Sequence, residues 1–193
     1  MLAVHRPGKE GIGGAHLEGI RRAYEGGYKI IFKMYSDLVH KPADIHAFLA
    51  ASEAADVVIG TRFEMKSSLD EWNLFRKVLT HLGHMLTRLL LRHNYDATGA
   101  FRVYRLDRID RRVFDLIQSR DYEFFFTSLT ILHMNDYPIA EIAIELPGRV
   151  YGHSKMELRH MAKSVVLMVT LGLKRVFARH RLLLASSDPA AKE

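Results

Sequence analysis

The chain has 193 residues, no cysteine and a formal net charge of +6 with histidine counted as neutral. Its 48% hydrophobic and 26% charged residues are typical of a soluble globular protein and exclude wholesale disorder. The lack of cysteine excludes disulfide frameworks, zinc ribbons and thiol nucleophiles. No run of about 20 apolar residues exists, so no ordinary membrane-spanning helix is expected.

The positive charge is concentrated near the C-terminus. Residues 153–181 carry seven Lys or Arg and one Glu, whereas residues 1–152 carry 20 basic and 19 acidic side chains. Such a segment indicates binding to nucleic acid, binding to an anionic membrane surface, or a solvated helix face. The apolar stretch between Lys163 and Lys174 favours the membrane surface. Nucleic acid is not the expected partner, because no recognition motif accompanies the charge.

Hydrophobic patterning predicts alternating helices and strands in the first third of the chain. A helix is expected over 16–25, a strand over 29–34, a helix over 42–51 and a strand over 56–60. A strand, a helix and a strand joined by short loops form a βαβ unit, so the two strands are expected to be parallel. The predicted fold class is α/β with a mostly parallel sheet.

The rest of the chain is expected to be mainly helical. Apolar periodicity predicts helices over 70–93, 107–118, 124–134 and 156–181, and alternation predicts a half-exposed strand over 139–146. The helix over 156–181 is basic and amphipathic, and residues 182–193 are expected to form a flexible tail.

Asp37 and Arg62 are candidate functional residues because of where they fall. Each follows the carboxyl end of a predicted parallel strand, which is the edge where open α/β sheets bind ligands. A carboxylate there can hold a divalent metal, and a guanidinium can hold phosphate. The alternative is a loop aspartate that caps the next helix and an ordinary surface arginine.

Two glycine-containing segments could surround an anion. Gly11-Ile-Gly-Gly14 precedes a helix but lacks the third glycine of a dinucleotide fingerprint, so a tight turn is the favoured interpretation. Arg149 and Lys155 flank a loop that contains Gly152, between the last predicted strand and the last predicted helix. This loop could close over a diphosphate or be a charged connector.

Six motifs in order resemble a known family. They are Gly11-x-Gly13, Met34–Pro42, Asp56–Phe63, Trp72-x3-Arg76, Asp96–Arg102 and Arg149–Met156. Together they resemble the family 2 glycosyltransferases of the dolichol-phosphate and polyprenyl-phosphate mannose synthase type. The resemblance covers roughly residues 5–165.

The resemblance implies a GT-A domain that binds a nucleotide sugar, of the GDP-mannose or UDP-glucose class. It implies inverting transfer of a hexose to a dolichyl or polyprenyl phosphate at the cytoplasmic face of a membrane. Asp37 matches the second aspartate of the D-x-D motif that binds Mg²⁺ or Mn²⁺, so Asp37 and Arg62 are the expected catalytic residues. The expected phosphate contacts are Arg76, Arg102, Arg149, Ser154 and Lys155.

The sequence also departs from the family pattern. Tyr35 stands in place of the first D-x-D aspartate, and Val39 and Thr127 stand where other members carry polar or acidic residues. The family's first strands, which carry the motif for the nucleotide base, have no counterpart. Residues 1–155 are therefore expected to form a partial GT-A domain with an open sheet edge, which a second copy or a partner chain would cover.

Three hypotheses remain open at this point. The first is a catalytically active glycosyltransferase. The second is a truncated or degenerate homologue that binds a nucleotide sugar or a partner chain without catalysis. The third is a nucleic-acid binder, which rests only on the basic C-terminal helix.

Overall fold

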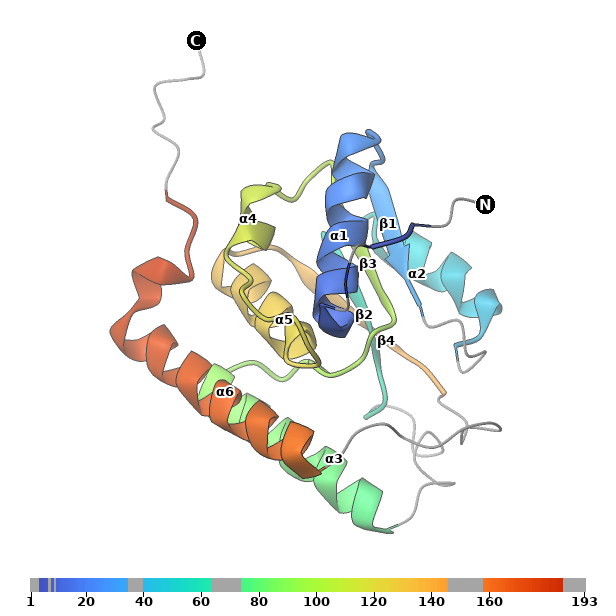
Figure 1. Cartoon of the computed structure of the whole chain (residues 1–193). Coiled ribbons are helices and arrows are strands. Elements are labelled where there is room, and N and C mark those ends of the chain that lie inside the picture. The colour runs from blue at the N-terminus through green and yellow to red at the C-terminus, as the bar shows by residue number, and fades with distance from the viewer. Residues whose placement is uncertain are drawn as a thin grey trace.

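A four-stranded sheet with helices on both faces forms the body of the protein in the computed structural model (Figure 1). The structure describes residues 4–6, 8, 10–34, 40–63, 74–145 and 158–185, with only the backbone at 75, 76 and 158–161. In these ranges, every helix is too short or too polar to cross a bilayer.

The sheet has the strand order β1-β3-β2-β4. The predicted strand pair is β1 (Ile30–Lys33) and β2 (Val57–Thr61), which point in the same direction but are not neighbours. Between them lies β3 (Arg102–Arg105), which is antiparallel to both, while β4 (Ile139–Ala143) pairs parallel with β2. Two of the three pairings are antiparallel, so the expected mostly parallel sheet is not confirmed, although β1, β2 and β4 share one direction.

Strand β3 was not predicted because its sequence does not look like a strand. Arginine occupies both ends of Arg102-Val-Tyr-Arg105, and this masks the apolar alternation. In the structure Val103 packs with Phe48 on one face of the sheet, and Tyr104 joins the larger core on the other face. Pairing with β1 on one edge and β2 on the other makes this segment a strand, so tertiary contacts decide it.

The helices follow the predicted order with changed lengths. In chain order they are α1 (Gly11–Glu25), η1 (Pro42–Asp44), α2 (Ile45–Ala51), α3 (Leu74–Leu86), η3 (Thr87–Leu91), α4 (Arg112–Asp115), α5 (Phe124–Met134), α6 (Leu158–Phe177) and η4 (Arg179–Arg181). The prediction over 124–134 is confirmed, whereas that over 107–118 shrinks to the short α4. The long helix predicted over 70–93 is α3 continued by the π-helical turn η3.

Helix α1 begins with the glycines that were interpreted as a turn or an anion cradle. The Gly14 backbone N–H donates to the Arg120 carbonyl oxygen at 2.9 Å. A Cβ atom at Gly13 would lie 2.8 Å from that same oxygen, which is too close for any larger residue. These glycines therefore allow the start of α1 to pack directly on the loop before α5.

Two apolar clusters cover the two faces of the sheet. The larger one joins the sheet to α1, α5 and α6 and includes Leu129 and Met168, and the smaller one surrounds Phe48 of α2. Helix α5 is buried along almost its whole length between the sheet and α6. Helix α6 in turn runs beside η3, where a Cβ atom at Gly172 would lie 3.2 Å from the Leu90 carbonyl oxygen (Figure 1).

Three basic side chains lie in the larger core. The Nζ atom of Lys33, at the end of β1, is buried without a hydrogen-bond partner, 4.6 Å from the ring centroid of Phe124 and 5.0 Å from that of Tyr104. Burial first, and then the nearby charge of Arg102, holds the pKa of Lys33 well below its usual value. His16 stacks on Phe124, and burial, Lys33 and Arg102 lower its pKa to about 3.

We predict that Lys33→Met stabilises the protein by about 1–3 kcal/mol, because methionine keeps the packing volume and removes a buried amine without a partner. Urea unfolding near neutral pH measures the change. Lys29→Met is the control, since Lys29 is exposed just before the same strand, and its effect should stay within about 0.5 kcal/mol. A lower unfolding midpoint for Lys33→Met would contradict the prediction.

Stability should also fall as the pH is lowered. The pKa values of His16 and His93 are lowered from 6.5 to about 3 in the folded protein, mainly by burial. Below pH 6.5 the unfolded chain therefore binds protons that the folded protein does not, and each histidine costs about 2 kcal/mol of unfolding free energy at pH 5. His16→Phe should remove its own share of this loss, whereas His46→Gln, at an exposed position, should leave the loss unchanged.

Candidate functional site

The carboxyl ends of β1, β2 and β4 lie at the same edge of the sheet. Because β1, β2 and β4 point in the same direction, the segments that follow them all leave from this edge. The segments after β1 and β4 are 35–39 and 146–157. They lie outside the described residues, and so do the predicted site residues Asp37, Arg149, Ser154 and Lys155. The side chain of Arg76 is likewise not described.

An ion pair joins the described residues next to these two segments. Lys41, which follows 35–39, and Glu145, which precedes 146–157, have Nζ and Oε2 2.6 Å apart. Residues that flank the predicted metal-binding segment and the predicted phosphate-binding segment therefore meet at the carboxyl edge. Sequence patterning gave no indication of this contact, because the two partners are 104 positions apart.

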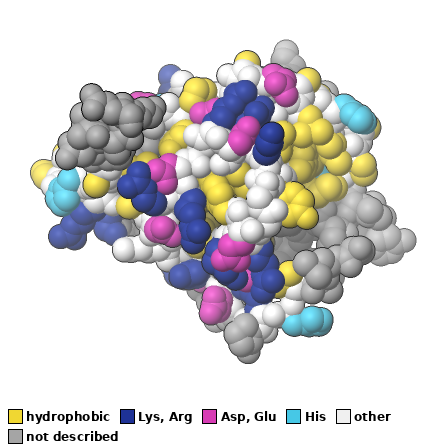
Figure 2. Space-filling view, turned by 90° about the horizontal axis from the view of Figure 1, so that it is seen from above, with side chains coloured by type: hydrophobic (Ala, Val, Ile, Leu, Met, Phe, Trp, Pro, Cys, Tyr) yellow, Lys and Arg dark blue, Asp and Glu magenta, His cyan; other side chains and the backbone are white. Residues whose placement is uncertain are grey.

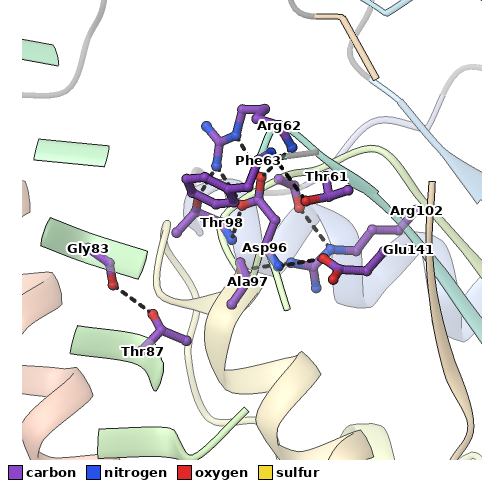
Figure 3. Close-up of polar contacts among 11 residues, drawn as sticks. Thr61, Arg62, Phe63, Gly83, Thr87, Asp96, Ala97, Thr98, Arg102 and Glu141 are labelled. Carbon is purple, nitrogen blue, oxygen red and sulfur yellow. Dashed lines mark hydrogen bonds and ion pairs between the residues drawn. The ribbon is translucent and has the colours of Figure 1, made fainter. Parts of the chain in front are cut away.

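Arg62 lies directly after β2 and forms a buried ion pair with Asp96 (Figure 3). Its Nε donates to Oδ2 of Asp96 at 2.7 Å, and its Nη2 donates to Oδ1 at 2.6 Å. Guanidinium and carboxylate thus meet in the two-point geometry that gives arginine pairs their directionality. The side chains are 12% and 1% exposed, respectively, so the pair is largely shielded from solvent.

Further hydrogen bonds fix the position of Asp96. Thr98 donates its backbone N–H and its hydroxyl to Oδ1, and Glu141 on β4 accepts the Asp96 backbone N–H at 2.8 Å (Figure 3). Burial raises the pKa of Asp96, but the charge and hydrogen bonds of Arg62 lower it further, so the net shift is downward. Asp96 is therefore ionised at neutral pH.

The ring of Phe63, which follows Arg62, lies beside this pair and contacts two imidazole rings of α3. The ring of Phe63 is 4.1 Å from that of His84 and 5.7 Å from that of His81. Burial lowers the pKa of His84, and the nearby carboxylate of Asp96 offsets only part of this effect. The rings of Phe63 and His84 therefore form a largely apolar wall next to Arg62, which favours the binding of an apolar group beside a phosphate.

Arg102 was predicted to contact phosphate, but the structure places its guanidinium in the core with 1% exposure. Its Nε donates to the Gly99 carbonyl at 2.8 Å, Nη1 to the Phe125 carbonyl at 2.9 Å and Nη2 to the Ala97 carbonyl at 2.8 Å. These contacts connect the loop before β3 to α5. The buried guanidinium of Arg102 therefore holds the loop before β3 against α5 and does not line the surface of the site.

The described residues contain no group of three or more histidine, aspartate or glutamate side chains arranged to hold a metal ion. The predicted metal ligand Asp37 is outside these residues, and its neighbour in the D-x-D pattern is Tyr35. A neutral phenol is a poor ligand for a hard cation such as Mg²⁺. The chain therefore supplies one carboxylate where the family pattern has two.

No protein-family model matches the chain. Comparison with individual proteins gives clear relatives. The chain is 32% identical over 171 residues to the undecaprenyl-phosphate mannosyltransferase of Micrococcus luteus, an alignment that covers 88% of this chain and 70% of that protein. The chain belongs to the polyprenyl-phosphate mannosyltransferase family. A polyprenol monophosphomannose synthase of Mycolicibacterium smegmatis is 27% identical over 180 residues, which cover 92% of this chain and 68% of that protein.

The family resemblance inferred from ordered motifs is thereby confirmed. The Arg62–Asp96 ion pair links two of those motifs, since Arg62 is the penultimate residue of one and Asp96 is the first residue of another. Sequence reasoning identified both residues but not their pairing. The contact of Glu141 with Asp96 was not predicted. The alternation of apolar and polar residues places Glu141 on the exposed face of β4, and Asp96 is 45 positions away in the chain.

We predict that Asp96→Asn destabilises the protein by about 3–5 kcal/mol, because it removes the buried carboxylate that pairs with the guanidinium of Arg62. Urea unfolding of Asp96→Asn, Arg62→Met and the double variant measures the coupling. The double variant should lose less stability than the sum of the single losses, by about 1–3 kcal/mol. Strictly additive losses would contradict a direct interaction between the two side chains.

Proposed function

We propose that the protein transfers a hexose from a nucleotide sugar to a polyprenyl phosphate. Its membership of the polyprenyl-phosphate mannosyltransferase family carries this proposal. The arrangement of Arg62 beside an apolar wall at the carboxyl edge of the sheet supports it. Nucleotide sugars of the GDP-mannose and UDP-glucose classes are the candidate donors, and the acceptor is a dolichyl or polyprenyl phosphate.

In an inverting transfer, an oxygen of the acceptor phosphate attacks the anomeric carbon of the sugar. The bond from that carbon to the donor diphosphate breaks, and the nucleoside diphosphate leaves with the bonding electrons. Both the attacking group and the leaving group are anionic, so cations near the anomeric centre lower the barrier. No general base is required, because the phosphate is already ionised.

Arg62 has the position for this role at the sheet edge. Asp96 holds the guanidinium plane in one orientation, which spares the entropy that a free arginine side chain would lose on binding a phosphate. Because Asp96 also neutralises the charge of Arg62, we propose that Arg62 positions a phosphate mainly through directed hydrogen bonds. Arg76, Arg149, Ser154 and Lys155 are proposed to supply the remaining phosphate contacts.

Asp37 is the proposed ligand for Mg²⁺ or Mn²⁺, together with oxygens of the donor diphosphate. Such a cation supplies charge neutralisation of the leaving diphosphate when it is bound. With Tyr35 in place of the first acid, we expect a weaker metal site than a paired-carboxylate motif provides.

A cytoplasmic location at a membrane surface fits a lipid-linked acceptor. We propose that the basic helix α6 lies against the membrane, so that the acceptor phosphate reaches the site while its prenyl chain stays in the lipid.

A second proposal is a non-catalytic subunit, and one observation favours it. In the described residues β1 pairs only with β3, and its Ile30, Ile31 and Phe32 are half-exposed. An open strand edge of this kind can accept a strand from a second copy or from a partner chain. Light scattering distinguishes the proposals, because a monomer with transferase activity excludes an obligatory subunit role.

The transfer reaction is tested with radiolabelled GDP-mannose or UDP-glucose and a polyprenyl phosphate in detergent, with Mg²⁺ or Mn²⁺. Arg62→Ala and Asp37→Ala should each lower the rate by about a hundredfold or more, the size expected for lost transition-state contacts. Arg108→Ala, which removes an exposed arginine elsewhere, is the control and should retain the original rate. Absence of turnover would leave the non-catalytic proposal, whereas equal rates in all variants would contradict the roles proposed for Arg62 and Asp37.

A further inference from the structure

A second group of arginines lies at the far end of the helix pair formed by η3 and α6. The two helices run side by side in the same direction, since Thr87 contacts Met168 and Leu90 approaches Gly172. Arg92 follows Leu90 by two residues, and Arg175 follows Gly172 by three residues. This register brings Arg92 and Arg175 together, with Arg179 one turn further along the chain.

These three cations are close enough to repel one another. Burial first, and then the charges of Arg92 and Arg179, lowers the pKa of Arg175. Within the described ranges, none of the three guanidinium groups forms an ion pair with a carboxylate. By contrast, dark-blue cations and magenta acids are interspersed on the face seen in Figure 2, and Arg21 and Arg22 of α1 both pair with Glu18.

Arg92 also has an unusual backbone conformation. Its φ of 57° lies in the left-handed region, which favours glycine and is costly for a long side chain. Glycine would adopt this φ angle without strain, so an arginine at this position suggests that its side chain has a function. Here that use is a third positive charge beside α6.

Large apolar side chains on the helices that carry the cluster face solvent. Next to the cations, Leu89 is 70% exposed and Phe177 is 81% exposed. The other exposed apolar residues of this helix layer are Leu74, Val78, Leu82, Met85, Val165, Val166, Val169, Leu173 and Val176. Unpaired cations next to exposed apolar side chains match the chemistry of a bilayer interface, with phosphates outside and hydrocarbon below.

We propose that Arg92, Arg175 and Arg179 form a binding site for the phosphate groups of anionic phospholipids, while Leu89, Phe177 and their apolar neighbours enter the bilayer interface. The ligand is the surface of an anionic bilayer, not the acceptor lipid phosphate of the transfer reaction. The site therefore goes beyond the proposed function, and it fixes which end of the helix pair is held at the membrane.

The test uses the full chain and vesicles that contain phosphatidylglycerol and phosphatidylcholine but no polyprenyl phosphate and no sugar donor. Vesicle co-sedimentation should show tight binding to the anionic vesicles and weak binding to pure phosphatidylcholine. Replacing all three arginines with alanine should weaken binding about a hundredfold, from about fivefold for each cation at an anionic surface. The control replaces Arg21, Arg22 and Arg112, which removes the same charge from exposed, acid-paired positions and should change binding by less than about threefold.

Arg92→Gly separates a binding role from a structural one. Because glycine adopts positive φ without strain, this variant should unfold at the same temperature as the unchanged protein or higher, yet bind anionic vesicles about fivefold more weakly. Equal losses in the two triple variants, or no preference for anionic vesicles, would overturn the proposal. So would release by millimolar inorganic phosphate or by a short DNA duplex, since these outcomes indicate a free-phosphate site or a nucleic-acid surface.

Discussion

The arrangement of the site depends on the hydrogen bonds that the buried guanidinium of Arg102 donates. Its nitrogen atoms bond to carbonyl oxygens of Ala97, Gly99 and Phe125, so this one side chain joins the loop before β3 to helix α5. A buried cation is stable only if its donors are met, and therefore the loop has little freedom to move. The same loop begins with Asp96, which in turn holds Arg62. A core residue thus determines the orientation of a residue at the sheet edge.

The chain places its charges in two different settings. At the carboxyl edge, Arg62 is matched by a buried carboxylate and is held in one orientation. At the end of the η3–α6 pair, Arg92 and Arg175 lack such partners and lie beside exposed apolar side chains. The first setting suits precise positioning of a reacting phosphate, whereas the second suits a surface of many anions where orientation matters little. Both settings are consistent with an enzyme that acts on a lipid-linked phosphate at a membrane.

Much of the fold could be predicted from local patterns, and what could not has identifiable causes. Helix α5 was predicted with correct bounds because its run of Phe, Leu and Ile is long enough to be unambiguous. Strands β1 and β2 point in the same direction, as predicted, but they are not neighbours, since β3 enters between them from a distant part of the chain. For the site, position after a strand identified Arg62, but only the folded structure could pair it with Asp96. The burial of Arg102 favours a structural role over the predicted phosphate contact, because a motif does not show whether its arginine faces the core or the solvent.

By itself, the sequence determined the family, the α/β class, the order of the helices and the accumulation of charge near the C-terminus. These properties are local or are carried by motifs in a fixed order, so they can be read without knowing which segments meet. The tertiary structure decided the strand order, the burial of Arg102, the Arg62–Asp96 pair and the proximity of Arg92 to Arg175. Each of these joins residues that are distant in the chain, and such contacts follow from packing and from the cost of leaving buried charges unpaired.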